Sequence, residues 1–200
     1  MDEIVLKGMA RWPNVPAVYG WLRLDRRGNW ILRGEPLNHP AAKAFINRNY
    51  ARDDAGCWYF QNGPQRVFVE LEYVPWVYRL DLEEGLQTHT GLTAALPEQV
   101  YMDEDGAVLV KTELGIGLLD DRDLALFCDA LCGTAGVHLE DDAINAGLMA
   151  LANGEVCAQS QLSFKFLEAK LVLQPIRRAQ VAAKFKFVAN PTQDDVDSLG

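Results

Sequence analysis

The sequence predicts an α+β protein in which two related units, each a β-hairpin followed by a helix, pack together with additional antiparallel strands. Three observations lead to this prediction. The same turn pattern occurs twice, a helical pattern of apolar residues follows each occurrence, and alternating strand patterns lie between and after them. A chain of 200 residues, of which 49% are hydrophobic and 24% charged, is large enough to bury such a core.

The repeated turn lies in residues 22–35 and 100–113, which align without a gap. Three of the fourteen aligned positions are identical, in the pairs Asp25/Asp103, Gly28/Gly106 and Glu35/Glu113. The aspartate can accept hydrogen bonds from backbone N–H groups of the turn, and the glycine can adopt the positive φ that this turn requires. Each copy is therefore predicted to be a β-hairpin. The pair indicates an internal duplication, although a hairpin followed by a helix is also a common arrangement.

A helix is expected after each hairpin. Asn38 can cap the first helix and Pro40 suits its first turn. The apolar face of this helix comprises Ala42, Phe45, Ile46 and Tyr50. Asp120 or Asp121 can cap the second helix, which Gly133 would end. The apolar face of the second helix comprises Leu124, Phe127, Cys128 and Leu131.

Between the two copies, residues 57–61 and 66–73 alternate as strands around Asn62-Gly63, a strong hairpin signal. A further strand is expected over residues 76–82. Later in the chain, residues 162–167 and 170–174 predict a pair of strands.

The remaining segments are less informative. Residues 142–153 allow a short helix, but the sequence does not otherwise assign the secondary structure of 134–160 and 175–189. Turn residues at 92–97 favour a boundary there. We therefore expect a first α+β unit over residues 1–92, a second over 93–189, and a loose acidic C-terminal tail over 190–200.

Composition narrows the classes of partner. The net charge is −9, from 19 basic and 28 acidic residues, which disfavours binding to nucleic acid. No apolar run approaches the roughly 20 residues that span a bilayer. The first residues are acidic where a signal peptide is basic. We therefore expect a cytoplasmic protein that does not associate with membranes.

The cysteines are scattered among apolar neighbours, so we expect all of them to be reduced and largely buried, without disulfides. They are Cys57, Cys128, Cys132 and Cys157. Cys128 and Cys132 have a helical spacing that could share a metal with His138, but the same helix face carries leucines, which favours core packing and no metal.

No standard catalytic signature occurs, and Gly115-Ile-Gly117 lacks the third glycine of a dinucleotide site. We therefore assign no catalytic residue and no cofactor. Enzyme function is the least favoured of the three function classes considered, because the paired acids of the chain resemble helix caps and turns.

The richest polar cluster surrounds residues 47–50, 61–62 and 65–66, where arginine and amide side chains could bind a carboxylate or phosphate. The candidate ligand-binding residues are Asn47, Arg48, Tyr50, Gln61, Arg66 and His89. We expect Arg48 and Arg66 to reach one pocket at the seam between the two units. The competing interpretation is that each arginine forms a structural ion pair with a carboxylate such as Asp53, Asp54 or Glu70.

Two functions fit these residue patterns. The first is a small-molecule-binding or regulatory module, such as one used in signalling, that recognises an anionic ligand. The second is a structural or protein-interaction module that binds a protein partner or its own copy through an exposed aromatic face. At strand spacing the aromatic residues near the polar cluster are chiefly core, and those left on the outer face would form this surface; they are Trp58, Tyr59, Phe60, Phe68, Tyr73, Trp76 and Tyr78.

Three stretches, at residues 12–22, 45–50 and 58–67, together resemble a proteobacterial family known only as a domain of unknown function. More distantly, the segment from the first hairpin through Gly34-Glu35-Pro36-Leu37 and the following helix is similar to another uncharacterised bacterial family. That resemblance implies an α+β fold with repeated motifs and a signalling role. Neither resemblance supplies a catalytic residue.

Overall fold

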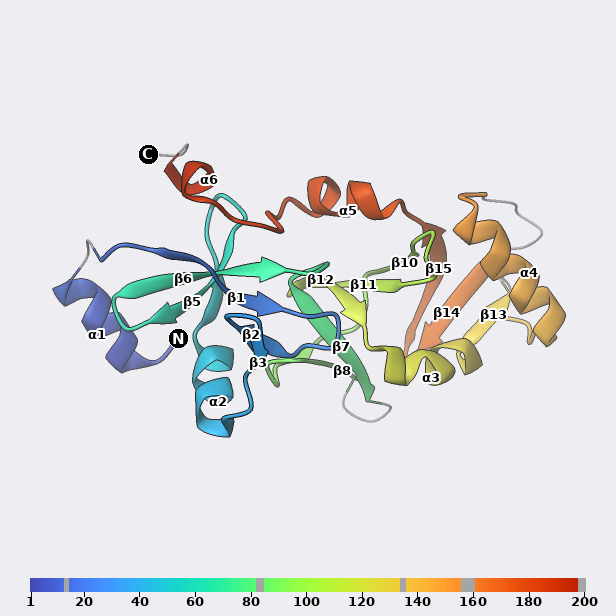
Figure 1. The fold of residues 1–200 in the computed structure, drawn as a ribbon. Helices are drawn as coiled ribbons and strands as arrows, with labels where there is room; N and C mark the ends of the chain where they lie inside the picture. Colours follow the sequence, from blue (N-terminus) through green and yellow to red (C-terminus); the bar gives the residue numbers. More distant parts are fainter. Residues whose placement is uncertain (13–14, 82–84, 134–135, 156–160, 198–200) are drawn as a thin grey trace. The chain divides into compact units, whose positions relative to one another are not determined.

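The computed structural model describes residues 1–12, 15–81, 85–133, 136–155 and 161–197 (Figure 1). These residues form six α-helices and two mixed sheets, of six and nine strands, which confirms the predicted α+β class. The chain divides into two compact units. The first contains Met1–Pro75, His89–Gly91 and the segment from Lys186 onward, and the second contains Trp76–Thr88 and Leu92–Phe185.

The first unit is built on the six-stranded sheet. Its strands are β1 (Val18–Leu24), β2 (Trp30–Leu32), β3 (Glu35–Pro36), β4 (Tyr50–Arg52), β5 (Trp58–Asn62) and β6 (Gln65–Leu71). Its helices are α1 (Glu3–Arg11), α2 (Pro40–Arg48) and α6 (Gln193–Asp197). The strand order is β3-β2-β1-β6-β5-β4, in which only β1 and β6 are parallel.

The two faces of this sheet are buried differently. On one face α2 packs against β5, where the rings of Phe45 and Phe60 meet edge to face at 5.4 Å. On the other face, the apolar cluster of Cys57, Tyr59 and Phe68 is extended by Tyr19, which stacks on Phe68 at 4.8 Å. Alternation of side chains along β5 and β6 thus supplies both layers of the core.

The second unit is built on the nine-stranded sheet. Its strands are β7 (Trp76–Asp81), β8 (Gly85–Thr88), β9 (Thr93–Ala94), β10 (Gln99–Met102), β11 (Val108–Thr112), β12 (Gly115–Leu119), β13 (Leu131–Gly133), β14 (Leu162–Phe166) and β15 (Ala169–Pro175). Its helices are the short 3-10 helix η1 (Asp121–Asp123), α3 (Leu124–Asp129), α4 (Asp141–Ala152) and α5 (Arg178–Phe185). The strand order is β13-β14-β15-β10-β11-β12-β7-β8-β9.

Six strands of this larger sheet follow the topology of the smaller one. The order β12-β11-β10-β15-β14-β13 corresponds to β3-β2-β1-β6-β5-β4, and in each set only the central pair is parallel. In the first unit Leu22 pairs with Val69 across that central pair, and in the second unit Val100 pairs with Leu173.

Both predicted hairpin turns have the expected geometry. The Asp25 carboxylate accepts the N–H groups of Arg27 and Asn29 at 2.9 and 2.7 Å. The equivalent carboxylate of the second turn, that of Asp103, accepts two N–H groups with the same sequence spacing, at 3.0 and 2.8 Å. Gly28 and Gly106 have φ values of 77° and 79°. The local turn chemistry was therefore sufficient to predict both turns.

The third aligned pair of the hairpins is not structurally equivalent. Glu35 pairs with Leu32 in β3, whereas Glu113 lies in the turn between β11 and β12, which pair from Thr112 and Gly115 outward. The strand β11 (Val108–Thr112) is longer than its counterpart β2 (Trp30–Leu32). The ungapped alignment therefore fails after this strand.

The helix boundaries differ from the prediction in three places. The helix α2 ends at Arg48, so Tyr50, expected on its apolar face, begins strand β4. His39, not Asn38, caps α2, because its Nδ1 accepts the backbone N–H of Ala42 at 3.2 Å. The helix α3 ends at Asp129, earlier than expected, because Leu131–Gly133 pairs with β14 as an edge strand. Cys128 and Cys132 therefore do not share a helix.

Just before the predicted C-terminal tail, the backbone of Val188 and Ala189 is hydrogen-bonded within the first unit. The N–H of Leu71 donates to the carbonyl of Ala189 at 2.7 Å, and the N–H of Val188 donates to the carbonyl of Gly56 at 3.0 Å. The helix α6 follows. Val188 and Ala189 belong to the segment 175–189, to which the sequence assigns no secondary structure.

Candidate functional site

Arg48, one of the two arginines predicted to bind a ligand, forms an ion pair with Asp2. It is the last residue of α2, and its Nε and Nη2 donate to the Asp2 carboxylate at 3.1 and 3.2 Å. The Oδ1 of Asn49 accepts the backbone N–H of Asp2 at 2.8 Å. Hydrogen bonding by Arg48 lowers the pKa of the Asp2 carboxyl and raises the pKa of the guanidinium.

This arrangement gives Arg48 a structural role, since it joins the end of α2 to the residue that precedes α1. The sequence predicted a structural ion pair as one interpretation of Arg48. The partner differs, because the expected acids were Asp53, Asp54 and Glu70. Asp2 lies 46 positions from Arg48, and no local pattern relates the two residues.

Three other predicted site residues, Asn47, Tyr50 and His89, meet around the buried Trp30. The Oδ1 of Asn47 accepts the Trp30 Nε1–H at 2.7 Å, and its Nδ2 donates to the His89 carbonyl at 3.5 Å. The Trp30 ring lies 5.2 Å from that of Tyr50 and 5.3 Å from that of His89, both edge to face. The Tyr50 hydroxyl donates to the Pro75 carbonyl at 3.0 Å.

Burial controls the ionisation of this group. It lowers the pKa of His89 to about 3, although the carboxylate of Asp25 acts in the opposite direction. Burial also raises the pKa of the Tyr50 hydroxyl well above its usual value. Both side chains are therefore neutral near pH 7, and their contacts are those of an aromatic core.

Gln61 and Arg66 do lie together. They are paired across β5 and β6, so their side chains share one face of the sheet. There they line a cavity of about 390 Å³, which we call the Arg66 cavity. Its lining comprises Met9, Trp12, Val15, Ala17, Gln61, Pro64, Arg66 and Phe68.

The polar groups of the Arg66 cavity are incompletely satisfied. The Arg66 guanidinium lies 4.7 Å from the centre of the Tyr59 ring, and no carboxylate of the described residues pairs with it. The Nε2 of Gln61 donates to the Gly63 carbonyl at 2.9 Å, whereas its buried Oε1 has no hydrogen-bond partner in the described part of the chain. Of the six predicted site residues, Gln61 and Arg66 line one cavity.

The aromatic residues considered for an exposed interaction face are all buried. Each is at most 8% exposed; they are Trp58, Tyr59, Phe60, Phe68, Tyr73, Trp76 and Tyr78. Strand alternation placed them in core layers on both faces, as their spacing indicated. The tryptophans with large exposed areas are others, namely Trp12 at 52% and Trp21 at 46%.

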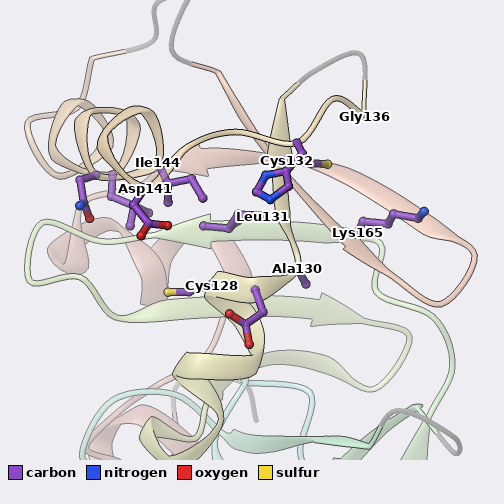
Figure 2. Close-up of a pocket in the computed structure, with 12 residues that line it drawn as sticks. Cys128, Ala130, Leu131, Cys132, Gly136, Asp141, Ile144 and Lys165 are labelled. Atoms are coloured by element: carbon purple, nitrogen blue, oxygen red, sulfur yellow. The ribbon is translucent and has the colours of Figure 1, made fainter.

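A cavity of the second unit, about 700 Å³ in volume, lies around the edge strand β13, between α3 and α4. Its lining includes Cys128, Cys132, His138, Asp141 and Lys165. In Figure 2 the Lys165 side chain extends away from Cys128 and Asp141. Lys165 therefore does not point toward Cys128 or Asp141.

The thiols of the described residues follow the packing prediction in part. Cys57 and Cys132 are buried and free, whereas Cys128 is free but exposed, contrary to expectation. Burial raises the pKa of the Cys57 thiol to about 11 and also raises that of Cys128. Cys157 lies outside the described residues.

Sequence reasoning missed a second cavity in the first unit. It lies between α2 and the sheet and has Arg33 and Trp21 at its edge. Arg33 is not among the six candidate residues that the sequence predicts. The informative signal was the arginine directly before Gly34 in a two-residue turn, a position that favours asparagine.

Two negative findings apply to the described residues alone. No group of three or more His, Cys, Asp or Glu side chains among them is arranged to hold a metal ion. None of their helices combines the length and apolar character needed to cross a bilayer.

Comparison with solved structures defines the class of protein. A DUF1285 family protein from Silicibacter pomeroyi DSS-3 has a TM-score of 0.53 and 19% identity to this chain, over 82% of this chain and 85% of that one. A DUF1285 family protein from Shewanella baltica OS155 has a TM-score of 0.42 and 20% identity, over 54% of this chain and 90% of that one. The first similarity shows that the chain shares the α+β fold of a DUF1285 structure.

The chain belongs to the family described as protein of unknown function (DUF2946), whose model matches residues 1–192. No curated protein matches the chain. The family match confirms the expected membership of a family of unknown function. The similarity to a DUF1285 family protein is a similarity of fold.

Proposed function

We propose that the first unit is a small-molecule-binding module that recognises an anionic ligand in the Arg66 cavity. One observation supports the proposal: the guanidinium of Arg66 and the buried Oε1 of Gln61, which has no hydrogen-bond partner in the described residues, belong to the lining of one cavity with aromatic residues. A volume of about 390 Å³ falls within the range of known ligand pockets. The guanidinium of Arg66 supplies fixed positive charge on a protein whose net charge is −9.

Gln61 restricts the ligand further. A buried acceptor without a donor destabilises the folded state by about 1–3 kcal/mol, and a ligand N–H or O–H group in the cavity would remove that penalty. Arg66 can bind a carboxylate or phosphate through paired N–H groups. The ligand class is therefore a small anion that also carries a hydrogen-bond donor and a flat apolar body, which would pack against Trp12 and Phe68.

A thermal-shift screen of small carboxylates and phosphate esters tests this proposal. A ligand at 100 times its Kd should stabilise the protein by about 2.7 kcal/mol. Arg66→Gln should reduce the affinity for such a ligand, whereas Arg23→Gln, on the exposed part of β1, should not. If every stabilising anion acts equally on wild type and Arg66→Gln, the Arg66 cavity is not the binding site.

The alternative function is an interaction module, and its contact surface would use aromatic residues that are exposed in the structure. Because the seven predicted aromatics are buried, an aromatic contact surface would have to involve Trp12 and Trp21. Sedimentation of wild type and Trp21→Ser at increasing concentration distinguishes the two functions. A dimer that Trp21→Ser dissociates would favour the interaction module.

We also infer that the two units derive from one duplicated element. The matching order of six strands, the single parallel pair in each set and the equivalent aspartate-glycine turns support this inference. Even single backbone bonds correspond. The N–H of Glu72 donates to the Leu24 carbonyl at 3.0 Å, and the N–H of Ile176 donates to the Met102 carbonyl at 3.0 Å. Matched strands that fail to superpose in an experimental structure would contradict it.

A further inference from the structure

A second cavity of the first unit is lined mainly by apolar side chains, and its polar lining residues are Arg33, Asn62 and Gln65. It has a volume of about 350 Å³ and lies where α2 covers the sheet; we call it the Arg33 cavity. Leu22, Phe60 and Val67 on the sheet are each at most 8% exposed, and Phe45 and Ile46 of α2 line the opposite side.

The mouth of this cavity exposes apolar surface. Trp21 is 46% exposed and Leu32 is 41% exposed. Water in contact with such surface is readily displaced by an apolar group, so the walls favour an aliphatic or aromatic ligand.

Arg33 is the one charged residue that lines the cavity. Its guanidinium lies 3.7 Å from the centre of the Trp21 ring, and its backbone N–H donates to the Trp21 carbonyl at 2.8 Å. No carboxylate in the described part of the chain forms an ion pair with it. A cation is thus held at the edge of an apolar cavity without a protein anion opposite it.

The backbone at Arg33 is unusual for arginine. Arg33 and Gly34 form the two-residue turn between β2 and β3, with φ values of 52° and 87°. Such a turn favours asparagine followed by glycine, and a left-handed conformation is strained for a long side chain. The turn itself therefore does not explain an arginine at this position, whereas an anion beside Trp21 would.

We propose that the Arg33 cavity binds a small amphipathic carboxylate, with its hydrocarbon body between α2 and the sheet and its carboxylate on Arg33. The volume suits a small molecule, and the charge of Arg33 complements a carboxylate. This site is separate from the Arg66 cavity, and the proposal does not depend on the function proposed above.

Calorimetric titration with octanoate tests the proposal. Each buried methylene contributes about 0.8 kcal/mol, about a fourfold change in affinity, so hexanoate should bind about 15-fold more weakly. Arg33→Asn introduces the residue that this turn prefers and removes the charge of the side chain. We expect this variant to bind octanoate about tenfold more weakly than wild type and 1-octanol equally well.

Two further variants complete the test. Ala42→Phe, on the cavity side of α2, should fill the space and abolish binding of both octanoate and 1-octanol, with folding checked by thermal melting. Arg23→Gln is the matched charge control and should bind octanoate as wild type does. The proposal is supported only if Arg33→Asn weakens octanoate binding, Ala42→Phe abolishes binding of both ligands and Arg23→Gln has no effect.

Several results would overturn the proposal. Octanoate affinity that is equal in wild type and Arg33→Asn would remove the role of Arg33. An absence of saturable binding, or equal affinities for hexanoate and octanoate, would exclude a buried hydrocarbon chain. A concentration-dependent dimer that Ala42→Phe abolishes would identify a second copy of the chain as the occupant.

Discussion

The side chain of Asn47 binds Trp30 through a hydrogen bond of 2.7 Å from the indole Nε1–H to the amide Oδ1. Trp30 is 2% exposed, so this bond satisfies a polar group that water does not reach. The Nδ2 of the same amide donates to the His89 carbonyl. Asn47 thus links α2, β2 and the segment at His89 within the first unit.

We predict that Asn47→Leu destabilises the protein by about 1–3 kcal/mol, because the Trp30 indole N–H would remain buried without an acceptor. The free energy of unfolding of the first unit, from urea denaturation followed by tryptophan fluorescence, measures the effect. The double variant Asn47→Leu/Trp30→Phe should recover part of the loss, since it removes both partners. Equal stability of wild type and Asn47→Leu would show that the bond does not contribute.

The second prediction concerns pH. The pKa of His89 is about 3 in the folded protein against 6.5 for an unperturbed histidine. Between these two pH values His89 is protonated in the unfolded chain but neutral in the folded protein. Its contribution to the free energy of unfolding is therefore fully present above pH 6.5 and decreases as the pH falls. Complete burial would give a loss of about 2 kcal/mol at pH 5, and the partial exposure of the residue as a whole reduces the expected loss to about 1 kcal/mol.

The variant His89→Gln isolates this contribution, because glutamine stays neutral in both states. The difference in unfolding free energy between wild type and His89→Gln should change by about 1 kcal/mol from pH 7 to pH 5, with wild type losing more. A difference that is constant over this range would show that His89 titrates alike in the folded and unfolded chain.

The third prediction concerns the hairpin turns. Val at Gly28 or Gly106 should destabilise the protein by at least about 1 kcal/mol, because both positions have positive φ and valine is branched at Cβ. Asn at the same positions is the matched control, since asparagine tolerates the left-handed region. No atom lies within 4 Å of a Cβ placed on Gly106, so strain, not collision, would cause the loss there. Equal effects of Val and Asn would argue against this explanation.

The sequence was most informative where the controlling interactions are local. The turn at Asp25–Gly28 and its counterpart at Asp103–Gly106 could be predicted because each turn satisfies its own N–H groups within a few residues. The strands around Asn62-Gly63 could also be predicted, although the turn consists of Gly63-Pro64, because Asn62 still pairs with Gln65.

Predictions failed where a distant segment competes with a local preference. The residues 131–133 continue a helical pattern, yet they form β13, because hydrogen bonds to β14 become available only after the chain folds back. The sequence assigns no secondary structure to residues 175–189, yet the backbone of Val188 is hydrogen-bonded to Gly56, a partner distant in the chain.

The sequence by itself determined the α+β class, the two hairpin turns and part of the apolar face of each predicted helix, because turn chemistry and residue periodicity act over short distances. Only the tertiary structure decided which polar groups meet. It placed Arg48 against Asp2, Asn47 against Trp30, and Gln61 beside Arg66. Periodicity determines the face on which a side chain lies, but the partner opposite that face depends on how separate segments pack together.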